Sequence, residues 1–224
     1  MTLDFLVIFE GNNLTALLEG LWVTVSMTFM ALILSTLLGL CIGLGRMSKN
    51  RTVSTLCAWY LAWFRGTPLL VQLMILYYGL AIGMQIDLSA SVAGVLGLGM
   101  YSAAYVSEIV RGAIQSIDKG QMEAGRSLGM SHWQTMGKVI LPQAVRRMLP
   151  PLCNEFIALT KNSSLLSVIT VSELMRAGNL IVSNNFRYFE IYLAIAVLYF
   201  LVNYSISVGI GRLEKRLQVE GGRA

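Results

Sequence analysis

Charged residues are scarce in this sequence, and their scarcity excludes an ordinary soluble domain. Asp, Glu, Lys and Arg make up only 13% of the 224 residues, whereas hydrophobic residues make up 55%. Soluble domains carry about 25% charged residues. Because the mean hydropathy is also high, at +0.65, the composition places the chain among integral membrane proteins.

Motifs for nucleotide, metal and covalent chemistry are also missing. No GxxxxGK[ST] occurs, so the chain has no phosphate-binding loop and cannot hydrolyse ATP in the P-loop manner by itself. The three cysteines, Cys41, Cys57 and Cys153, form no CxxC pair, and the single histidine, His132, has no second ligand nearby in sequence. No Ser, His and acid arrangement is evident. We therefore expect no catalytic residue, no metal site and no cofactor in this chain.

Long apolar runs instead predict an all-α integral membrane protein with about five transmembrane helices. The predicted spans are residues 21–44, 69–83, 92–110, 145–171 as a broken helix, and 191–210. Residues 53–64 are interpreted as an interfacial elbow, and residues 172–187 as a polar external segment. The transmembrane domain then covers residues 19–211, between an external N-terminal segment (1–18) and a cytoplasmic basic tail (212–224).

The distribution of basic residues orients these spans. Of the seventeen basic residues, only Lys161, Arg176 and Arg187 lie in the broken or external region, and the other fourteen fall on one side of the predicted topology. Short loops rich in Lys and Arg belong on the cytoplasmic side. We therefore expect the N-terminus outside and the C-terminus in the cytoplasm. The net charge of +5 is explained by orientation and by attraction to anionic lipid, so it indicates no nucleic-acid partner.

The longest polar interruption between apolar regions runs from Asp118 to Pro142 and carries clear helix signals. Asp118 can cap a helix, and Gly129 can end it in the left-handed conformation. Ser131 and Gln134 have the spacing of a capping box, which predicts a second helix directly afterwards. The segment therefore indicates a helix, a sharp turn and another helix, on the cytoplasmic side.

At these residues the chain resembles the membrane permease subunits of binding-protein-dependent ABC importers, whose signature is Glu-Ala-Ala-x3-Gly-x9-Ile-x-Leu-Pro. The corresponding residues here are Glu123, Ala124, Gly125, Gly129, Val139, Leu141 and Pro142. Gly125 replaces the second Ala, which loosens a helix by about 1 kcal/mol, and Val139 replaces Ile. Further matches are FRGTPLL (64–70), SIDKGQMEA (116–124), LPQAVRRMLPPL (141–152) and KNSSL (161–165). They are similar to the polar amino-acid branch, which includes histidine, glutamine, glutamate and cystine permeases.

The resemblance implies the fold, partners and location of the chain. It implies a type I ABC importer transmembrane domain in the bacterial cytoplasmic membrane, with residues 118–130 as a coupling helix. It implies a cytoplasmic ATPase dimer that binds ATP and Mg²⁺, an external or periplasmic solute-binding protein, and a second permease copy or a homologous permease. In this role Glu123 would fix the coupling helix, Gly129 would let it turn close to its partner, and Pro142 would set where the next helix begins.

A second candidate site comprises Lys161, Asn162, Ser163 and Ser164. Asn and Ser side chains compete with helical hydrogen bonds, so a helix break is predicted there. A half-helix starting at Ser163 or Ser164 would point amide groups at an anion such as an amino-acid carboxylate. An external loop is the alternative. Asn162 stands where many relatives carry Asp, so the resemblance implies a neutral or acidic amino acid as the substrate.

Tyr105 and Glu108 are the next candidates for a substrate pathway, because an acid within a span faces a cavity or a partner rather than lipid. A structural ion pair is the alternative for Glu108. The resemblance implies that the chain translocates a polar amino acid, powered by ATP hydrolysis on a separate subunit. The competing class is an ion channel or membrane enzyme in which the cytoplasmic corner is only a connector. A channel would be expected to carry current without nucleotide.

Overall fold

The structure, a computed structural model, describes residues 3–221, and their side chains up to residue 212. Every regular element in this part of the chain is helical, which confirms the all-α prediction. The elements are η1 (Phe5–Phe9), α1 (Asn13–Arg46), α2 (Arg51–Gly66), α3 (Leu69–Met74), η2 (Ile75–Gly79), α4 (Leu80–Met84), α5 (Ala90–Gln115), α6 (Lys119–Ser127), α7 (His132–Thr135), η3 (Met136–Ile140), α8 (Leu141–Asn162), η4 (Ser163–Ile169), α9 (Leu174–Asn185) and α10 (Tyr188–Gly221). Segments η2 and η3 are π-helical, whereas η1 and η4 are 3-10 helices.

Three of the described helices are long and apolar enough to cross a membrane on their own, namely α1, α5 and residues Tyr188–Arg212 of α10. Two bent pairs also qualify. Helix α2 turns by 104° into Leu69–Met84, and the helix His132–Ile169 turns by 50° into α9. Counting each bent pair as one span gives up to five spans within the described residues. This number agrees with the sequence, while the membrane boundaries themselves stay predictions.

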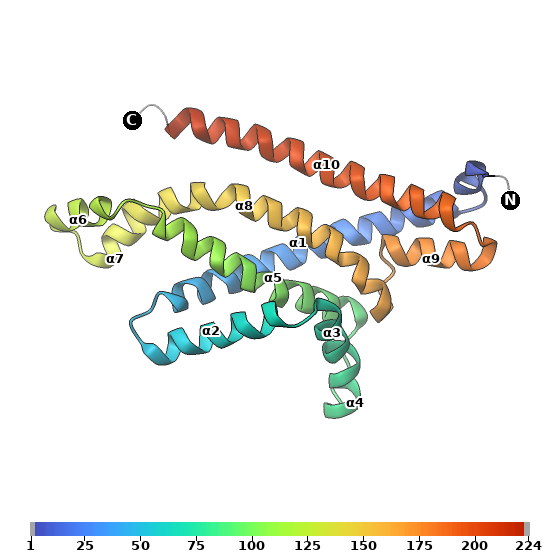
Figure 1. Cartoon of the computed structure of the whole chain (residues 1–224), viewed down its shortest axis with the longest axis horizontal. Coiled ribbons are helices and arrows are strands. Elements are labelled where there is room, and N and C mark those ends of the chain that lie inside the picture. The colour runs from blue at the N-terminus through green and yellow to red at the C-terminus, as the bar shows by residue number, and fades with distance from the viewer. Residues whose placement is uncertain (1–2, 222–224) are drawn as a thin grey trace.

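Helices α1, α5, α8 and α10 run along the length of the molecule (Figure 1). At one end lie α6 and α7, and at the other lie α9 and η1. Segment α3–α4 projects sideways from this arrangement. The described ends of the chain, on η1 and α10, therefore lie at opposite ends of the molecule, as a chain with an odd number of spans requires.

Small residues bring α1 and α5 into close contact. A Cβ added at Gly39 would lie 2.7 Å from Cβ of Val106, and one added at Gly43 would lie 2.8 Å from the carbonyl oxygen of Ser107. Ser35, one turn before Gly39, is fully buried. The predicted stripe of small residues on the first span thus serves packing within the chain, because only glycine allows the two backbones to approach this closely.

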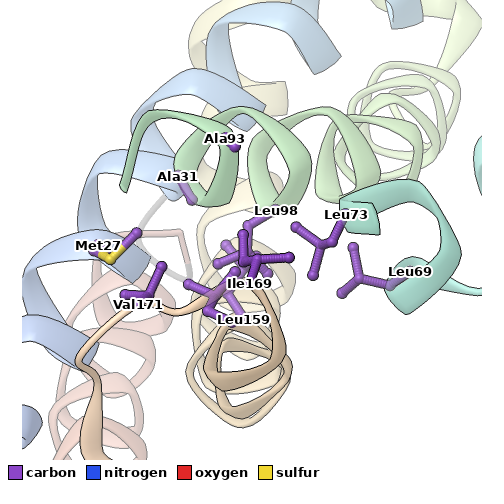
Figure 2. Packing of buried hydrophobic residues seen from close by; sticks show 10 residues of the cluster. Met27, Ala31, Leu69, Leu73, Ala93, Leu98, Leu159, Ile169 and Val171 are labelled. Carbon is purple, nitrogen blue, oxygen red and sulfur yellow. The ribbon is translucent and has the colours of Figure 1, made fainter. Parts of the chain in front are cut away.

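A central apolar cluster joins the halves of the chain (Figure 2). It is built from α1, α3, α5, α8 and η4, together with Val171, two residues after the end of η4. Its buried members are Met27, Ala31, Leu69, Leu73, Ala93, Leu98, Leu159, Leu166, Ile169 and Val171. The cluster fixes the apolar residues on both sides of the KNSSL stretch against α5, so the candidate site at Lys161 sits on a packed element rather than on a free loop.

The structure corrects two expectations about the second half of the chain. The break expected within residues 145–171 is not found at the adjacent prolines Pro150 and Pro151, since both lie inside the uninterrupted helix α8. Residues 172–187 are more than the predicted polar segment, because they contain the partly buried helix α9. The buried residues Leu174, Ile181 and Val182 of α9 pack with α1 and α10 in a second cluster. Local polarity was misleading here, since α9 is amphipathic and buries only one face.

The remaining boundaries differ in detail from the sequence prediction. Residues 53–64 are more than an elbow, since they belong to the 16-residue helix α2. The domain limits at residues 19 and 212 fall inside α1 and α10. They therefore mark changes of composition and not ends of helices. Residues 222–224 of the predicted basic tail lie outside the described residues.

Candidate functional site

Backbone hydrogen bonds close the turn after α6 at the predicted glycine. Gly129 has a φ of +81°, which is the left-handed conformation that glycine adopts without strain. Its N–H donates to the carbonyl of Arg126, and the N–H of Met130 donates to the carbonyl of Gly125, both at 3.1 Å. This pair of bonds is a Schellman motif. The sequence prediction of a left-handed helix end at Gly129 is confirmed.

Side-chain caps fix the starts of the two helices that flank this turn. Asp118 Oδ1 accepts the N–H of Gly120 at 2.6 Å and so caps α6. The Ser131 hydroxyl accepts the N–H of Gln134, and the Gln134 side chain accepts the N–H of Ser131, at 3.2 and 2.8 Å. The predicted capping box is therefore present. With all three helix ends satisfied, the corner is a defined structure.

The outer surface of this corner carries unpaired polar and apolar side chains. Met122 packs inward against the cluster formed by α5, η3 and α8, whereas Glu123 is exposed. No hydrogen bond or ion pair of Glu123 occurs within the described part of the chain. Leu128 and Trp133 are 83% and 80% exposed. An acid and two large apolar side chains at the tip suit contact with another protein.

Gly125, the departure from the family signature, is explained by Thr135. A Cβ added at Gly125 would overlap Cγ2 of Thr135 and would lie 2.8 Å from its Oγ1. Thr135 cannot turn away freely, because it is fully buried and its hydroxyl donates to the carbonyl of Ser131. The alanine of the signature would therefore not fit here. Gly125 lets α6 pack directly on the following helix.

The end of the signature lies on the helix that leads from the corner into α8. Val139 is half-buried, and Leu141 packs against the cluster around Ile140 and Ala144. Pro142 stands in the first turn of α8, the position predicted for it, although helical backbone leads into α8 without a break from His132 through η3. A π-turn directly before a proline accommodates its missing N–H donor. The corner is thus joined to α8 without a hinge at Pro142.

The KNSSL stretch does not contain the predicted start of a half-helix. Helix α8 runs to Asn162 and tightens into the 3-10 segment η4 without a break. The N–H of Ser163 donates to the carbonyl of Leu159, and the hydroxyls of Ser163 and Ser164 donate back to the carbonyls of Thr160 and Lys161. The Ser163 amide is therefore not free for an anion. Serine hydroxyls can bond back to the preceding turn, and this overrode the expected break.

The real break comes at Thr170, whose φ is +69°. The helix that follows, α9, is capped by the fully buried carboxylate of Glu173. Its oxygens accept the N–H groups of Met175 and Arg176 at 2.9 and 2.8 Å, and Tyr199 of α10 donates to the same carboxylate at 3.0 Å. A carboxylate of the protein itself thus caps the helix that follows the break, so the N–H groups of Met175 and Arg176 are already paired.

Lys161 and Asn162 face different surroundings. Lys161 and Ser164 line a pocket of about 430 Å³ whose other walls are mainly from α10, including Tyr192 and Tyr199. Asn162 is half-buried and lies outside this lining. Among the described residues, neither the Lys161 ammonium group nor the Asn162 side-chain amide makes a hydrogen bond or an ion pair. Both groups therefore remain available to a polar ligand.

A polar cluster between α5 and α8 includes one residue that the sequence analysis missed. The hydroxyls of Tyr101 and Tyr105 lie 3.0 Å apart. Ser102, on the same helix, donates to Glu155 of α8 at 2.7 Å. Asn162 stands seven residues after Glu155, two turns along the same face of the helix. Glu155 was missed because it follows two prolines in a segment read as broken, although an acid inside an apolar span is itself a signal.

Comparison with known proteins identifies the family. Residues 31–219 match the family described as binding-protein-dependent transport system inner membrane component. The chain belongs to this family. Among its relatives, the probable amino-acid ABC transporter permease protein YckA of Bacillus subtilis is 42% identical over 89% of this chain and 88% of that protein. The glutamine transport system permease protein GlnP of Escherichia coli is 39% identical over 91% and 93%.

Solved structures agree with this assignment. A crystal structure of an amino acid ABC transporter with histidines superposes on the permease with a TM-score of 0.90, at 42% identity, over 96% of this chain and all of that chain. The inward-facing MetNI methionine ABC transporter gives a TM-score of 0.77 at 19% identity, and so supports the fold alone. The permease therefore has the fold of a type I importer subunit.

In the C-terminal half of α5, Glu108 of the permease forms an ion pair. Its Oε2 lies 2.6 Å from Nη2 of Arg111, and both side chains are partly exposed. Glu108 and Tyr105 also line a pocket with Arg46 and Arg65. The sequence offered two alternatives for Glu108, a cavity or an ion pair, and the structure contains both. Its role in transport stays a prediction.

No group of three or more His, Cys, Asp or Glu side chains that could hold a metal ion occurs in the described range. His132 lies at the exposed corner, edge-on to Trp133 with their rings 5.6 Å apart.

Proposed function

We propose that the permease carries a polar amino acid across the bacterial cytoplasmic membrane, in an importer powered by a separate ATPase dimer. The relatives named for amino-acid and glutamine transport support the substrate class. The family name implies a binding protein, which would deliver the substrate from outside. A second copy or a homologous permease would complete the pore. The family assignment favours this function over an ion channel or a membrane enzyme.

The observation that carries the coupling mechanism is the rigid, exposed corner at one end of the molecule (Figure 1). Helix α6 follows directly on α5, and α7 continues through η3 into α8. Arg147 of α8 also donates to the Ser116 hydroxyl after α5, at 2.9 Å. A displacement of α6 by the ATPase would therefore move α5 and α8 together. Such rocking of packed helices produces alternating access.

The proposed orientation places this corner in the cytoplasm. Arg126, Lys138, Arg146 and Arg147 are all exposed on or near it, as expected for a cytoplasmic segment. Reporter fusions to the two ends of the chain test the orientation. We expect a cytoplasmic signal from a C-terminal fusion and an external signal from an N-terminal fusion. The same side for both would refute an odd number of spans.

For the substrate pathway we propose two positions on α8. Lys161, with Ser164 and the α10 tyrosines, supplies a cation for the substrate carboxylate. A lysine in the membrane costs at least about 2.5 kcal/mol on insertion scales, so it needs an anionic partner or access to water. Ser163 supports this position from the buried side. The second position is the α5-facing row of Glu155 and Asn162.

The second position would hold the opposite end of the substrate. Glu155 could accept the substrate ammonium, and Asn162 could pair with an uncharged polar side chain such as an amide. Tyr101 and Tyr105 would line the way, with Glu108 at its cytoplasmic end. Since Asn162 brings no negative charge, this arrangement favours a neutral or acidic amino acid over a cationic one.

Co-reconstitution tests the proposed function. The permease alone in vesicles should neither hydrolyse ATP nor accumulate amino acids, whereas vesicles holding the permease, its ATPase and its binding protein should take up a polar amino acid in an ATP-dependent manner. Voltage-clamp recording of the permease alone provides the contrast. A substrate-dependent current without nucleotide would favour the channel alternative and overturn the proposal.

A further inference from the structure

A positively charged pocket of about 500 Å³ lies between α1, α2 and α5. Its lining includes Arg46 from the end of α1, Arg65 from the end of α2, and Tyr105 and Glu108 from α5. Glu108 already pairs with Arg111 at 2.6 Å. Neither of the two ion pairs found among the described residues involves Arg46 or Arg65. The pocket therefore keeps the charge of two arginines.

Both arginines hold donors ready for an anion. Nε of Arg46 is buried and has no hydrogen-bond partner, although buried donors in proteins are nearly always paired. The guanidinium of Arg65 lies over the ring of Tyr105, with its central carbon 5.6 Å from the ring centroid. This contact uses the face of the guanidinium and leaves its N–H groups free, because they point outward in its plane. A phosphate accepts bonds from such forks.

An apolar groove adjoins the charged pocket and shares two of its residues. The groove, of about 310 Å³, is lined by Arg46, Ser54, Thr55, Ala58, Trp59 and Ala62. On the same helix, Leu56, Trp59 and Trp63 are 66%, 71% and 57% exposed. Tryptophan at a membrane interface sits at the level of lipid headgroups. A cationic pocket that opens onto an apolar, indole-rich surface matches a molecule with an anionic head and an apolar tail.

We propose that the notch between α1, α2 and α5 binds an anionic phospholipid, with its phosphate between Arg46 and Arg65 and an acyl chain along Trp59 on α2. Lys49 in the loop between α1 and α2, and Arg51 at the start of α2, support the cytoplasmic leaflet as the source. Free phosphate would use the arginines but not the groove, so the apolar wall favours the lipid. Tyr105 can serve both regions, since its hydroxyl faces Tyr101 while Arg65 covers its ring.

The lipid would link the membrane to the moving parts of the permease. Arg46 and Arg65 belong to helices that pack on α5 (Figure 1), and α5 leads directly to α6. A phosphate between the arginines would relieve their mutual repulsion and hold α2 against α1 and α5. Binding therefore stabilises one arrangement of these helices, independently of which amino acid is carried.

The test uses the permease in complex with its ATPase, reconstituted in nanodiscs. Brominated phosphatidylglycerol and brominated phosphatidylcholine are compared as quenchers of tryptophan fluorescence, with Trp59→Phe to assign the signal. We expect phosphatidylglycerol to quench preferentially. The double variant Arg46→Gln, Arg65→Gln should weaken that preference about tenfold or more. Arg212→Gln, which removes an exposed charge on α10, is the matched control and should leave it unchanged.

The double variant Arg46→Lys, Arg65→Lys controls for misfolding, because it keeps both charges and should retain most of the preference for phosphatidylglycerol. Equal quenching by both lipids in the wild type would overturn the proposal, as would an unchanged preference in the double Gln variant. Displacement of phosphatidylglycerol by millimolar inorganic phosphate would also overturn it, since the site would then recognise a small anion without its tail.

Discussion

Gly129 allows a clean test of the coupling corner, because its replacement adds backbone strain and nothing else inside the chain. A Cβ added there meets no atom within 4 Å, while the φ is +81°. An L-residue in the left-handed conformation costs about 1–2 kcal/mol. Gly129→Ala should therefore weaken the turn by this amount, which corresponds to a factor of about 5–30 in its closed population. Gly129→Asn should cost less, because asparagine tolerates this conformation.

Amide hydrogen exchange on the permease–ATPase complex measures the effect directly. The N–H groups of Gly129 and Met130 close the turn on Arg126 and Gly125. Their amide exchange rate should rise from the wild type to Gly129→Asn and further to Gly129→Ala. Between the wild type and Gly129→Ala the rate should differ by the factor of about 5–30 given above. Stimulation of ATP hydrolysis by the loaded binding protein should fall in the same order.

Gly129→Leu separates strain from docking. It carries the same backbone penalty as Ala, and it adds a side chain at the exposed surface between Leu128 and Met130. If α6 approaches the ATPase closely, Gly129→Leu should lower coupling and ATPase association well below the level of Gly129→Ala, although the two variants show equal amide exchange at the turn. Wild-type exchange and coupling in all three variants would refute the role assigned to the left-handed turn.

Three further predictions concern neighbouring positions. Glu123→Ala should weaken ATPase association in pull-down assays without altering the fold, because Glu123 is exposed, and normal association would count against a docking role. Gly125→Ala should lower the thermal stability of the complex, because overpacking against Thr135 costs about 1–3 kcal/mol and exceeds the gain in helix propensity of about 1 kcal/mol. Adding Thr135→Ala should reverse the loss. A gain in stability in the single variant would contradict the steric argument. Lys161→Met should abolish uptake while the complex still assembles, and Lys161→Arg should retain uptake. Asn162→Asp should shift the preference toward cationic amino acids. Unchanged uptake kinetics for a panel of amino acids in both Lys161→Met and Asn162→Asp would place the substrate elsewhere.

The local signals in the sequence were sufficient for much of this protein. Its apolar runs determined the helical membrane class, because hydrocarbon requires backbone groups to be paired within each segment. The caps at Asp118, Gly129 and Ser131 determined the corner, since each depends only on residues within a few positions. The signature around Glu123 determined the family.

Only the tertiary structure decided what lies between and around these signals. It showed that Gly125 is matched by Thr135 and that Glu173 fills a helix start. It also brought Ser102 of α5 to Glu155 of α8. Sequence reasoning placed a break at Ser163 because it weighed side-chain competition locally, whereas packing of Leu159, Leu166 and Ile169 in the central cluster keeps that helix continuous. Contacts between distant segments leave no local pattern in the sequence. Burial of side chains in the tertiary structure therefore decided which of the possible local conformations forms.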